Sequence, residues 1–206
     1  MSEAFPVKPF KITLPDGGGC SILLAGSTRS GKSYGAEHIL GKYFGKEYVK
    51  ILHTCSPNAD IYKQFDCIHA PGYYPSVMAD QMYIQKETSN RYKFLNILDD
   101  LVLGIKFDKP LLSALTIGRN SHISVIQGIQ ALTLLNSSSR SNYNFVCLFH
   151  FNSDTEVERA VKMFLTTYFP SNMNLAQKMR MYRELTRDHC FFLVDNIEGT
   201  VTRCRI

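Results

Sequence analysis

The sequence predicts an α/β fold in which a mostly parallel sheet is covered by helices. Short, wholly apolar segments such as "CSILLAG" and "NFVCLF" have the pattern of strands that are buried on both faces. They alternate with helical patterns along most of the chain, which is typical of a parallel sheet flanked by helices. The 206 residues are 45% hydrophobic and 20% charged. That is enough for one domain, residues 1–206, with a full hydrophobic core.

The expected elements follow from these patterns in chain order. The first half alternates strands with two helices, and the second half repeats the alternation before ending in a predicted C-terminal β-hairpin. Strands are expected at 8–14, 20–26, 48–56, 93–100, 122–130, 144–151, 190–196 and 200–206. Helices are expected at 32–44, 76–90, 110–118, 154–168 and 174–187, with a short helix or loop at 131–143.

Bulk properties exclude some classes of protein. The segment "MSEAFPVKPF" has no long apolar run, so it is not expected to be a signal peptide. No apolar stretch approaches the roughly 20 residues of a membrane span, and we expect a soluble, intracellular protein. The six cysteines form no CxxC pair and are expected to be mainly reduced core thiols. The net charge of +5 permits an anionic partner such as nucleic acid.

Residues 26–33, "GSTRSGKS", match the phosphate-binding pattern GxxxxGK[ST] at every fixed position. A predicted buried strand precedes them and a predicted helix follows. Small residues let several backbone N–H groups converge on phosphate oxygens, and the helix amino end adds its positive dipole. A chance match is the alternative, although chance matches rarely fall between a strand and a helix. The expected nucleotide-binding residues are Gly26, Ser27, Thr28, Arg29, Ser30, Gly31, Lys32, Ser33 and Tyr34.

A pair of acids ends the predicted strand "KFLNILDD". This pattern of apolar residues followed by acids is typical of a Walker B element. We assign Asp99, together with Ser33, to a Mg²⁺ ion that accompanies ATP, and Asp100 to the polarisation of the attacking water. The alternative is an Asp that caps a following helix. Two adjacent acids favour hydrolysis over a binary switch.

A glutamine is expected beside the nucleotide at the end of the next strand. "HISVIQGIQ" places Gln130 at the strand's carboxyl end, where the strands of such a sheet converge on a ligand. We predict that Gln130 senses the γ-phosphate or the attacking water, and that Gln127 is a sheet amide. Arg119 and Arg140 lie in polar loops before and after this region. Either could reach a neighbouring subunit's γ-phosphate as an arginine finger, although a solvated loop arginine is the alternative for each.

These motifs refine the predicted fold to a RecA-like P-loop NTPase core. The strand "YVKILHTC" lies between the phosphate loop and the acidic strand end. This resembles the P-loop class that carries an additional strand between its two nucleotide motifs (ASCE) more than it resembles GTPases or small kinases.

The order "GSTRSGKS", "FLNILDD", "IGRNSHISVIQGIQ" and "SRSNYNFVCLF" resembles FtsK–HerA type ATPases, and within them the poxvirus-type viral genome-packaging ATPases. The resemblance covers residues 10–196. It implies an ATP-driven ring that pumps double-stranded DNA at a capsid vertex or portal, in the host cytoplasm, a viral factory or the virion. It also implies that Lys32 and Ser33 form the Walker A pair, Asp99 and Asp100 the Walker B pair, and Gln130 the sensor. Many relatives in the wider superfamily have Asp-Glu where this chain has Asp-Asp, and the shorter Asp100 side chain lies farther from the water.

A DNA motor needs basic residues that contact phosphates without reading the sequence. Two segments are candidates. The first lies between the strand expected at 48–56 and the acidic strand end, and it offers Lys63, Tyr73, Tyr74, Lys86, Arg91 and Lys93. The second is the helix expected at 174–187, which offers Arg180, Arg183 and Arg187; a solvated amphipathic helix is the alternative interpretation of this segment. Two other functions stay open from sequence: a P-loop nucleoside or nucleotide kinase, and a non-catalytic assembly protein gated by nucleotide.

Overall fold

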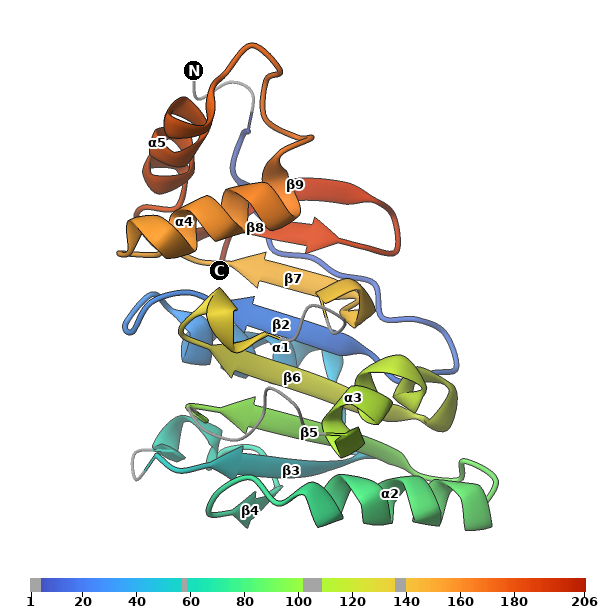
Figure 1. Cartoon of the computed structure of the whole chain (residues 1–206). Helices are drawn as coiled ribbons and strands as arrows, with labels where there is room; N and C mark the ends of the chain where they lie inside the picture. The colour runs from blue at the N-terminus through green and yellow to red at the C-terminus, as the bar shows by residue number, and fades with distance from the viewer. Residues whose placement is uncertain (1–4, 57–58, 102–108, 136–139) are drawn as a thin grey trace.

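One nine-stranded sheet organises the part of the chain that the computed structural model describes, residues 5–56, 59–101, 109–135 and 140–206. The strand order is β1-β9-β8-β7-β2-β6-β5-β3-β4, as Figure 1 shows. The strands are β1 (Lys8–Pro9), β2 (Ser21–Ala25), β3 (Tyr48–Thr54), β4 (Cys67–Ala70), β5 (Lys93–Asp99), β6 (Ile123–Ile129), β7 (Phe145–Leu148), β8 (Cys190–Asp195) and β9 (Thr200–Arg205).

The six strands from β7 to β4 in that order pair in parallel. Their carboxyl ends therefore lie along one edge of the sheet, at the left in Figure 1. Strand β8 runs antiparallel to both β7 and β9. The predicted mostly parallel sheet and the C-terminal β-hairpin are both confirmed.

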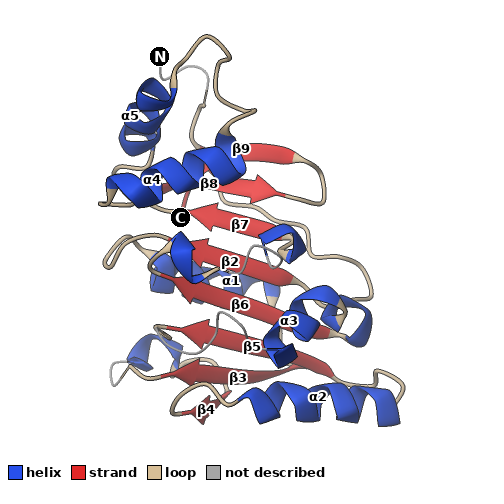
Figure 2. Cartoon of the chain, in the orientation of Figure 1, coloured by secondary structure: helices blue, strands red, loops and turns tan. Residues whose placement is uncertain are grey.

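Helices cover both faces of the sheet. Figure 2 shows α1 behind the sheet and α2, α3 and α4 in front of it. Side chains along β2 alternate between two cores: Ile22 and Leu24 pack on the α1 side, while Leu23 and Ala25 pack on the other. This is the pattern expected of a strand buried on both faces. The helices are α1 (Lys32–Tyr43), α2 (Pro75–Glu87), α3 (Lys109–Thr116), α4 (Asp154–Ala160) and α5 (Leu175–Leu185).

Several local predictions were wrong. The first strand spans only Lys8–Pro9, because only these two residues pair with β9. Strand β4 was missed, since its half-exposed Cys67–Ala70 lacks a long apolar run. The helix expected at 154–168 is α-helical only to Ala160 and continues as the π-helical turn η6 (Val161–Leu165). By contrast, the short helix or loop expected at 131–143 is confirmed by two short 3-10 helices in its described residues, while residues 136–139 lie outside the described part.

The order of strands at the centre of the sheet differs from their order in the chain. Strand β6 lies between β2, which leads into the phosphate loop, and β5, which ends in the acids. The additional strand between the two motifs is therefore β6 and not β3, as the sequence order had indicated, because β3 pairs with the far side of β5. Consequently the end of β6, with Gln130, lies between the two nucleotide motifs.

The structure also bears on the expectations about membrane-spanning segments and cysteines. Within the described ranges, no helix has the length and apolar character that crossing a bilayer requires. All six cysteines are free thiols. Cys20, Cys147, Cys190 and Cys204 are buried, whereas Cys55 is exposed on the loop after β3.

Candidate nucleotide-binding site

The predicted phosphate loop connects β2 to α1 at the carboxyl edge of the sheet. Its backbone is tied to both neighbouring strands, because Gly26 N donates to Ile129 O at 3.2 Å and Ser27 N donates to His150 O at 3.0 Å. Gly31, at the start of α1, has φ of 102°, a left-handed conformation that favours glycine. The loop is therefore held in a compact turn at the positive end of α1.

A glycine is also required at position 26 for a steric reason. A Cβ there would lie 2.6 Å from Ser30 Oγ and 2.7 Å from the Cβ of Phe149. Both approaches are too close for any side chain, so the curled loop excludes every residue larger than glycine at this position.

Lys32 lies across the loop. Its Nζ donates to the carbonyl oxygens of Gly26, at 2.7 Å, and Ser27, at 2.8 Å. Burial lowers the pKa of Lys32, and the nearby charges of Asp99 and Asp100 oppose that shift. The ammonium group thus lies between the loop and the two predicted acids.

The carboxylate of Asp99, at the end of β5, lies beside two hydroxyl groups. Its Oδ2 accepts hydrogen bonds from Tyr62 Oη at 2.8 Å and from Ser33 Oγ at 3.4 Å. Its Oδ1 lies beside Gly128, where an added Cβ would come within 3.2 Å. Burial raises the pKa of Asp99, while the hydrogen bond from Tyr62 lowers it. A carboxylate and a hydroxyl this close are the oxygen ligands that Mg²⁺ prefers, so these residues fit the ion.

Gln130 joins the phosphate loop to the second acid. Its Nε2 donates to Asp100 Oδ1 at 2.9 Å, and its Oε1 accepts from Thr28 Oγ1 at 3.2 Å. Asp100 has φ of 53°, an unusual backbone conformation for a non-glycine residue. All three side chains are exposed to solvent. Residues from three separate segments thus form one hydrogen-bonded chain at the mouth of the site.

Gln127 has a different environment from Gln130. Its side chain is buried and accepts a hydrogen bond from the hydroxyl of Tyr143. This places Gln127 inside the sheet's core rather than at its edge.

The two candidate finger arginines lie at the opposite edge of the sheet. Arg119 belongs to the short helix before β6, where its carbonyl accepts from Gly19 N at 2.7 Å and its side chain is exposed. Arg140 begins the short helix before β7. A seven-residue strand spans roughly 23 Å, which separates Arg119 from the nucleotide residues of its own chain.

The residues of the first candidate DNA segment do not lie together on one edge of the sheet. Lys93 begins β5 at the amino edge of the sheet, whereas Tyr74 precedes α2 at the carboxyl edge. Lys63 forms an ion pair with Asp60 at 2.6 Å. Arg183 pairs with Asp154, and with Arg187 it lines a cavity of about 500 Å³ beside the loop residue Arg29. Arg183, on α5, and Arg187, just beyond it, therefore lie beside the phosphate loop, whereas Arg180 lines a different cavity with Arg203.

Sequence patterns did not identify Tyr62 as part of the site. It lies in the 3-10 helix η2 (Ala59–Tyr62), is 2% exposed and reaches Asp99 from 37 positions earlier in the chain. No motif marks this residue, because its position depends on how η2 packs against α1 and β5.

The phosphate loop, the acids at the end of β5 and the intervening β6 together define the fold of a P-loop NTPase with an additional central strand. No family model matches the sequence, and no curated protein matches it. Solved structures do match the fold.

The DNA-packaging ATPase B204 from Sulfolobus Turreted Icosahedral Virus aligns with a TM-score of 0.64 at 15% identity, over 89% of this chain and 96% of that chain. The genome packaging NTPase B204 from Sulfolobus turreted icosahedral virus 2, in complex with AMPPCP, has a TM-score of 0.60 at 15% identity, with 90% and 96% covered. The cytoplasmic domain of EssC has a TM-score of 0.51 at 13% identity, over 66% of this chain and 32% of that one. The chain therefore shares its overall fold with these P-loop proteins.

Proposed function

We propose that the protein is an ATP-hydrolysing motor that translocates double-stranded DNA and packages a viral genome into a preformed capsid. The observation that carries the proposal is the chain of hydrogen bonds from Thr28 through Gln130 to Asp100. It couples the phosphate loop to the acid that would polarise water. Support for packaging comes from the similar structures, which include a DNA-packaging ATPase and a genome packaging NTPase bound to AMPPCP.

Each residue has a distinct role in this proposal. The backbone N–H groups at the start of α1 bind phosphate oxygens, and Lys32 neutralises charge on the β- and γ-phosphates. Ser33 and Asp99 would hold Mg²⁺. When bound, the ion would supply positive charge that offsets the negative charge developing on the phosphates during hydrolysis. Asp100 accepts a proton from the attacking water, and Gln130 orients that water.

An arginine finger from Arg119 or Arg140 constrains how subunits would assemble. Both residues lie at the amino edge of the sheet, whereas the nucleotide residues lie at the carboxyl edge. A finger therefore requires the amino edge of one subunit to face the carboxyl edge of the next. Such a head-to-tail contact closes into a ring when its rotation permits. The ring would thread double-stranded DNA and dock on capsid vertex or portal proteins.

ATP hydrolysis by the purified protein, with and without long double-stranded DNA, tests the proposal. We expect DNA to stimulate turnover and Lys32→Ala to abolish it. Lys46→Ala, at an exposed lysine just beyond α1, is the matched control and should retain activity.

Other outcomes would contradict the motor function. Phosphate transfer that requires a nucleoside or nucleotide acceptor would indicate a kinase. Bound nucleotide without turnover under any condition would indicate an assembly protein. If double-stranded DNA of any length leaves the rate of ATP hydrolysis unchanged, hydrolysis is not coupled to DNA translocation and the packaging role is overturned.

A further inference from the structure

Glu156 is a buried acid to which the proposed reaction assigns no role. It lies in the first turn of α4 and is 8% exposed. Among the residues that the structure describes, no other aspartate or glutamate is buried. Its Oε2 accepts a hydrogen bond from Leu132 N at 2.5 Å, and its Oε1 accepts one from Arg159 Nη1 at 3.1 Å. The carboxylate therefore joins α4 to the chain two residues beyond Gln130.

We propose that Glu156 is a positioning residue for ATP hydrolysis, and that it acts by holding the backbone beyond Gln130 in place. The inference rests on the proposed function, because it requires that Gln130 orients the attacking water. Glu156 itself touches neither the nucleotide nor that water. It fixes where the Gln130 amide lies between Thr28 and Asp100.

The side-chain contacts of Gln130 do not by themselves fix its position. Its two hydrogen bonds, with Thr28 and Asp100, join exposed side chains. Such bonds contribute little net free energy, because water competes for the same groups. The position of the amide therefore depends mainly on the backbone on either side of it.

The backbone around Gln130 has one anchor on each side. Before it, Ile129 ends β6, and its carbonyl oxygen accepts from Gly26 N at 3.2 Å. After it, Leu132 begins a short 3-10 helix and is 3% exposed. The first N–H groups of a helix have no acceptor within that helix, and a buried donor needs one. Glu156 supplies that acceptor, so its carboxylate is the second anchor.

A carboxylate holds the N–H group of Leu132 more firmly than a neutral side chain does. Hydrogen bonds to an ionised acceptor are shorter and stronger than neutral ones. Because the second oxygen binds Arg159, whose side chain is 39% exposed, the carboxylate is held in one orientation. Burying a carboxylate is costly, and well-packed apolar side chains often stabilise a fold at least as well as a buried ion pair does. Stability alone therefore does not explain an acid at position 156.

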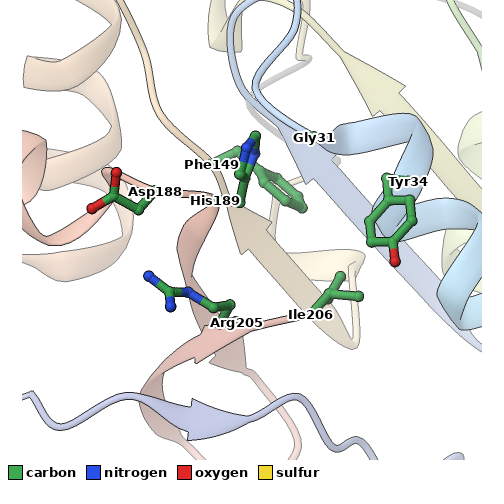
Figure 3. Close-up of a pocket in the computed structure, with 7 residues that line it drawn as sticks. All are labelled: Gly31, Tyr34, Phe149, Asp188, His189, Arg205 and Ile206. Carbon is green, nitrogen blue, oxygen red and sulfur yellow. The ribbon is translucent and has the colours of Figure 1, made fainter.

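The chain that leads into α4 also holds the phosphate loop. Phe149 directly follows β7, and its ring lies beside Gly31 at the start of α1, as Figure 3 shows. Further along, Asn152 N donates to Ser27 Oγ at 2.9 Å. Residues 149–156 thus contact the phosphate loop at one end and the segment after the sensor glutamine at the other. The same short stretch of chain holds both sides of the hydrogen bond between the loop and that glutamine.

Steady-state ATP hydrolysis by Glu156→Met and Glu156→Gln tests the inference. Methionine fills a similar space without an acceptor, whereas the amide oxygen of glutamine still accepts from Leu132 N. We expect Glu156→Met to lower kcat about tenfold, the effect of a small displacement of a group that orients a reactant, with an unchanged KM for ATP. Glu156→Gln should retain most of the activity. Glu158→Met is the matched control and should behave as wild type, because Glu158 lies on the same helix and pairs with Lys162 at the surface.

A double substitution separates positioning from a structural role. If Glu156 acts through Gln130, Glu156→Met should lower kcat in the wild-type background and have no further effect in the Gln130→Ala background. The same tenfold loss in both backgrounds would show that Glu156 only supports the fold, and would overturn the inference. A folded Glu156→Met protein with wild-type kcat would also overturn it, whether or not KM changes.

Urea denaturation establishes whether Glu156→Met folds. If it does not fold, Arg159→Met takes its place, because this substitution frees one oxygen of the same carboxylate at a partly exposed position. Its loss of kcat should likewise vanish in the Gln130→Ala background, and wild-type kcat in Arg159→Met would then overturn the inference. Failure confined to these variants leaves the proposed function standing, whereas a wild-type protein that does not hydrolyse ATP refutes the proposed function and the inference with it.

Discussion

The hydroxyl of Tyr62 donates a hydrogen bond to Asp99 Oδ2 at 2.8 Å. Tyr62 is nearly inaccessible to solvent and belongs to η2, while Asp99 ends β5. The same oxygen accepts from Ser33 Oγ at 3.4 Å. Two hydrogen bonds on one oxygen orient the carboxylate, so that Oδ1 is held beside Gly128.

Tyr62→Phe should raise the Mg²⁺ concentration needed for half-maximal ATP hydrolysis. Loss of a hydrogen bond that orients a metal ligand typically costs about tenfold or more in metal affinity. The measurement is a Mg²⁺ titration at saturating ATP. Tyr92→Phe, at an exposed tyrosine 42% accessible to solvent, should behave as wild type. An unchanged titration for Tyr62→Phe would show that Tyr62 only fills the core.

Gln130→Ala should reduce ATP turnover, whereas Gln127→Ala should reduce the stability of the fold. Gln130 is exposed at the site, so its loss should leave the free energy of unfolding unchanged and reduce turnover by about a hundredfold. Gln127 is buried against the hydroxyl of Tyr143. Its loss leaves that hydroxyl without its partner, and we expect about 1–3 kcal/mol of destabilisation. Equal effects of both substitutions on stability and turnover would refute the distinct roles.

Arg119→Ala should impair ATP hydrolysis only through a neighbouring subunit. If Arg119 is the finger, its loss should reduce turnover by about a thousandfold. Mixing Arg119→Ala with Asp100→Ala subunits should then restore part of the activity, because an intact site meets an intact finger at some interfaces. Lys46→Ala, at an exposed lysine just before β3 and so at the same sheet edge, should have full basal activity. No rescue at any mixing ratio would rule out Arg119, and the same mixing with Arg140→Ala would test the second candidate.

The free energy of unfolding should fall as the pH drops below about 6.5. His53 is fully buried, its Nε2 lies 3.0 Å from Asn96 Oδ1, and burial lowers its pKa. The unfolded chain takes up a proton near pH 6.5, where the folded protein keeps His53 neutral. The unfolded state therefore binds more protons, and stability falls with decreasing pH.

Urea denaturation at pH 7.5 and 5.5 measures this dependence. His53→Gln should show a smaller loss of stability between the two pH values than wild type. The remaining loss comes in part from His38 and His150, whose pKa values burial also lowers. An identical pH dependence in wild type and His53→Gln would exclude His53 as a source.

Much of the site was predictable because its residues follow strands. The loop after β2, the acids after β5 and Gln130 after β6 each follow an apolar run, and parallel strands bring their carboxyl ends to one edge. The same rule predicted neither β4 nor the π-helical turn after α4, because both depart from regular hydrophobic spacing.

The sequence by itself determined the fold class, the phosphate loop and the set of polar residues at the carboxyl edge. Only the tertiary structure decided which of them meet: Gln130 contacts both Thr28 and Asp100 because β6 inserts between β2 and β5. It also decided that Tyr62 holds Asp99 and that Arg119 lies at the far edge. The physical reason is that strand periodicity is local, whereas strand order and the docking of η2 depend on burying apolar surface between segments distant in the chain.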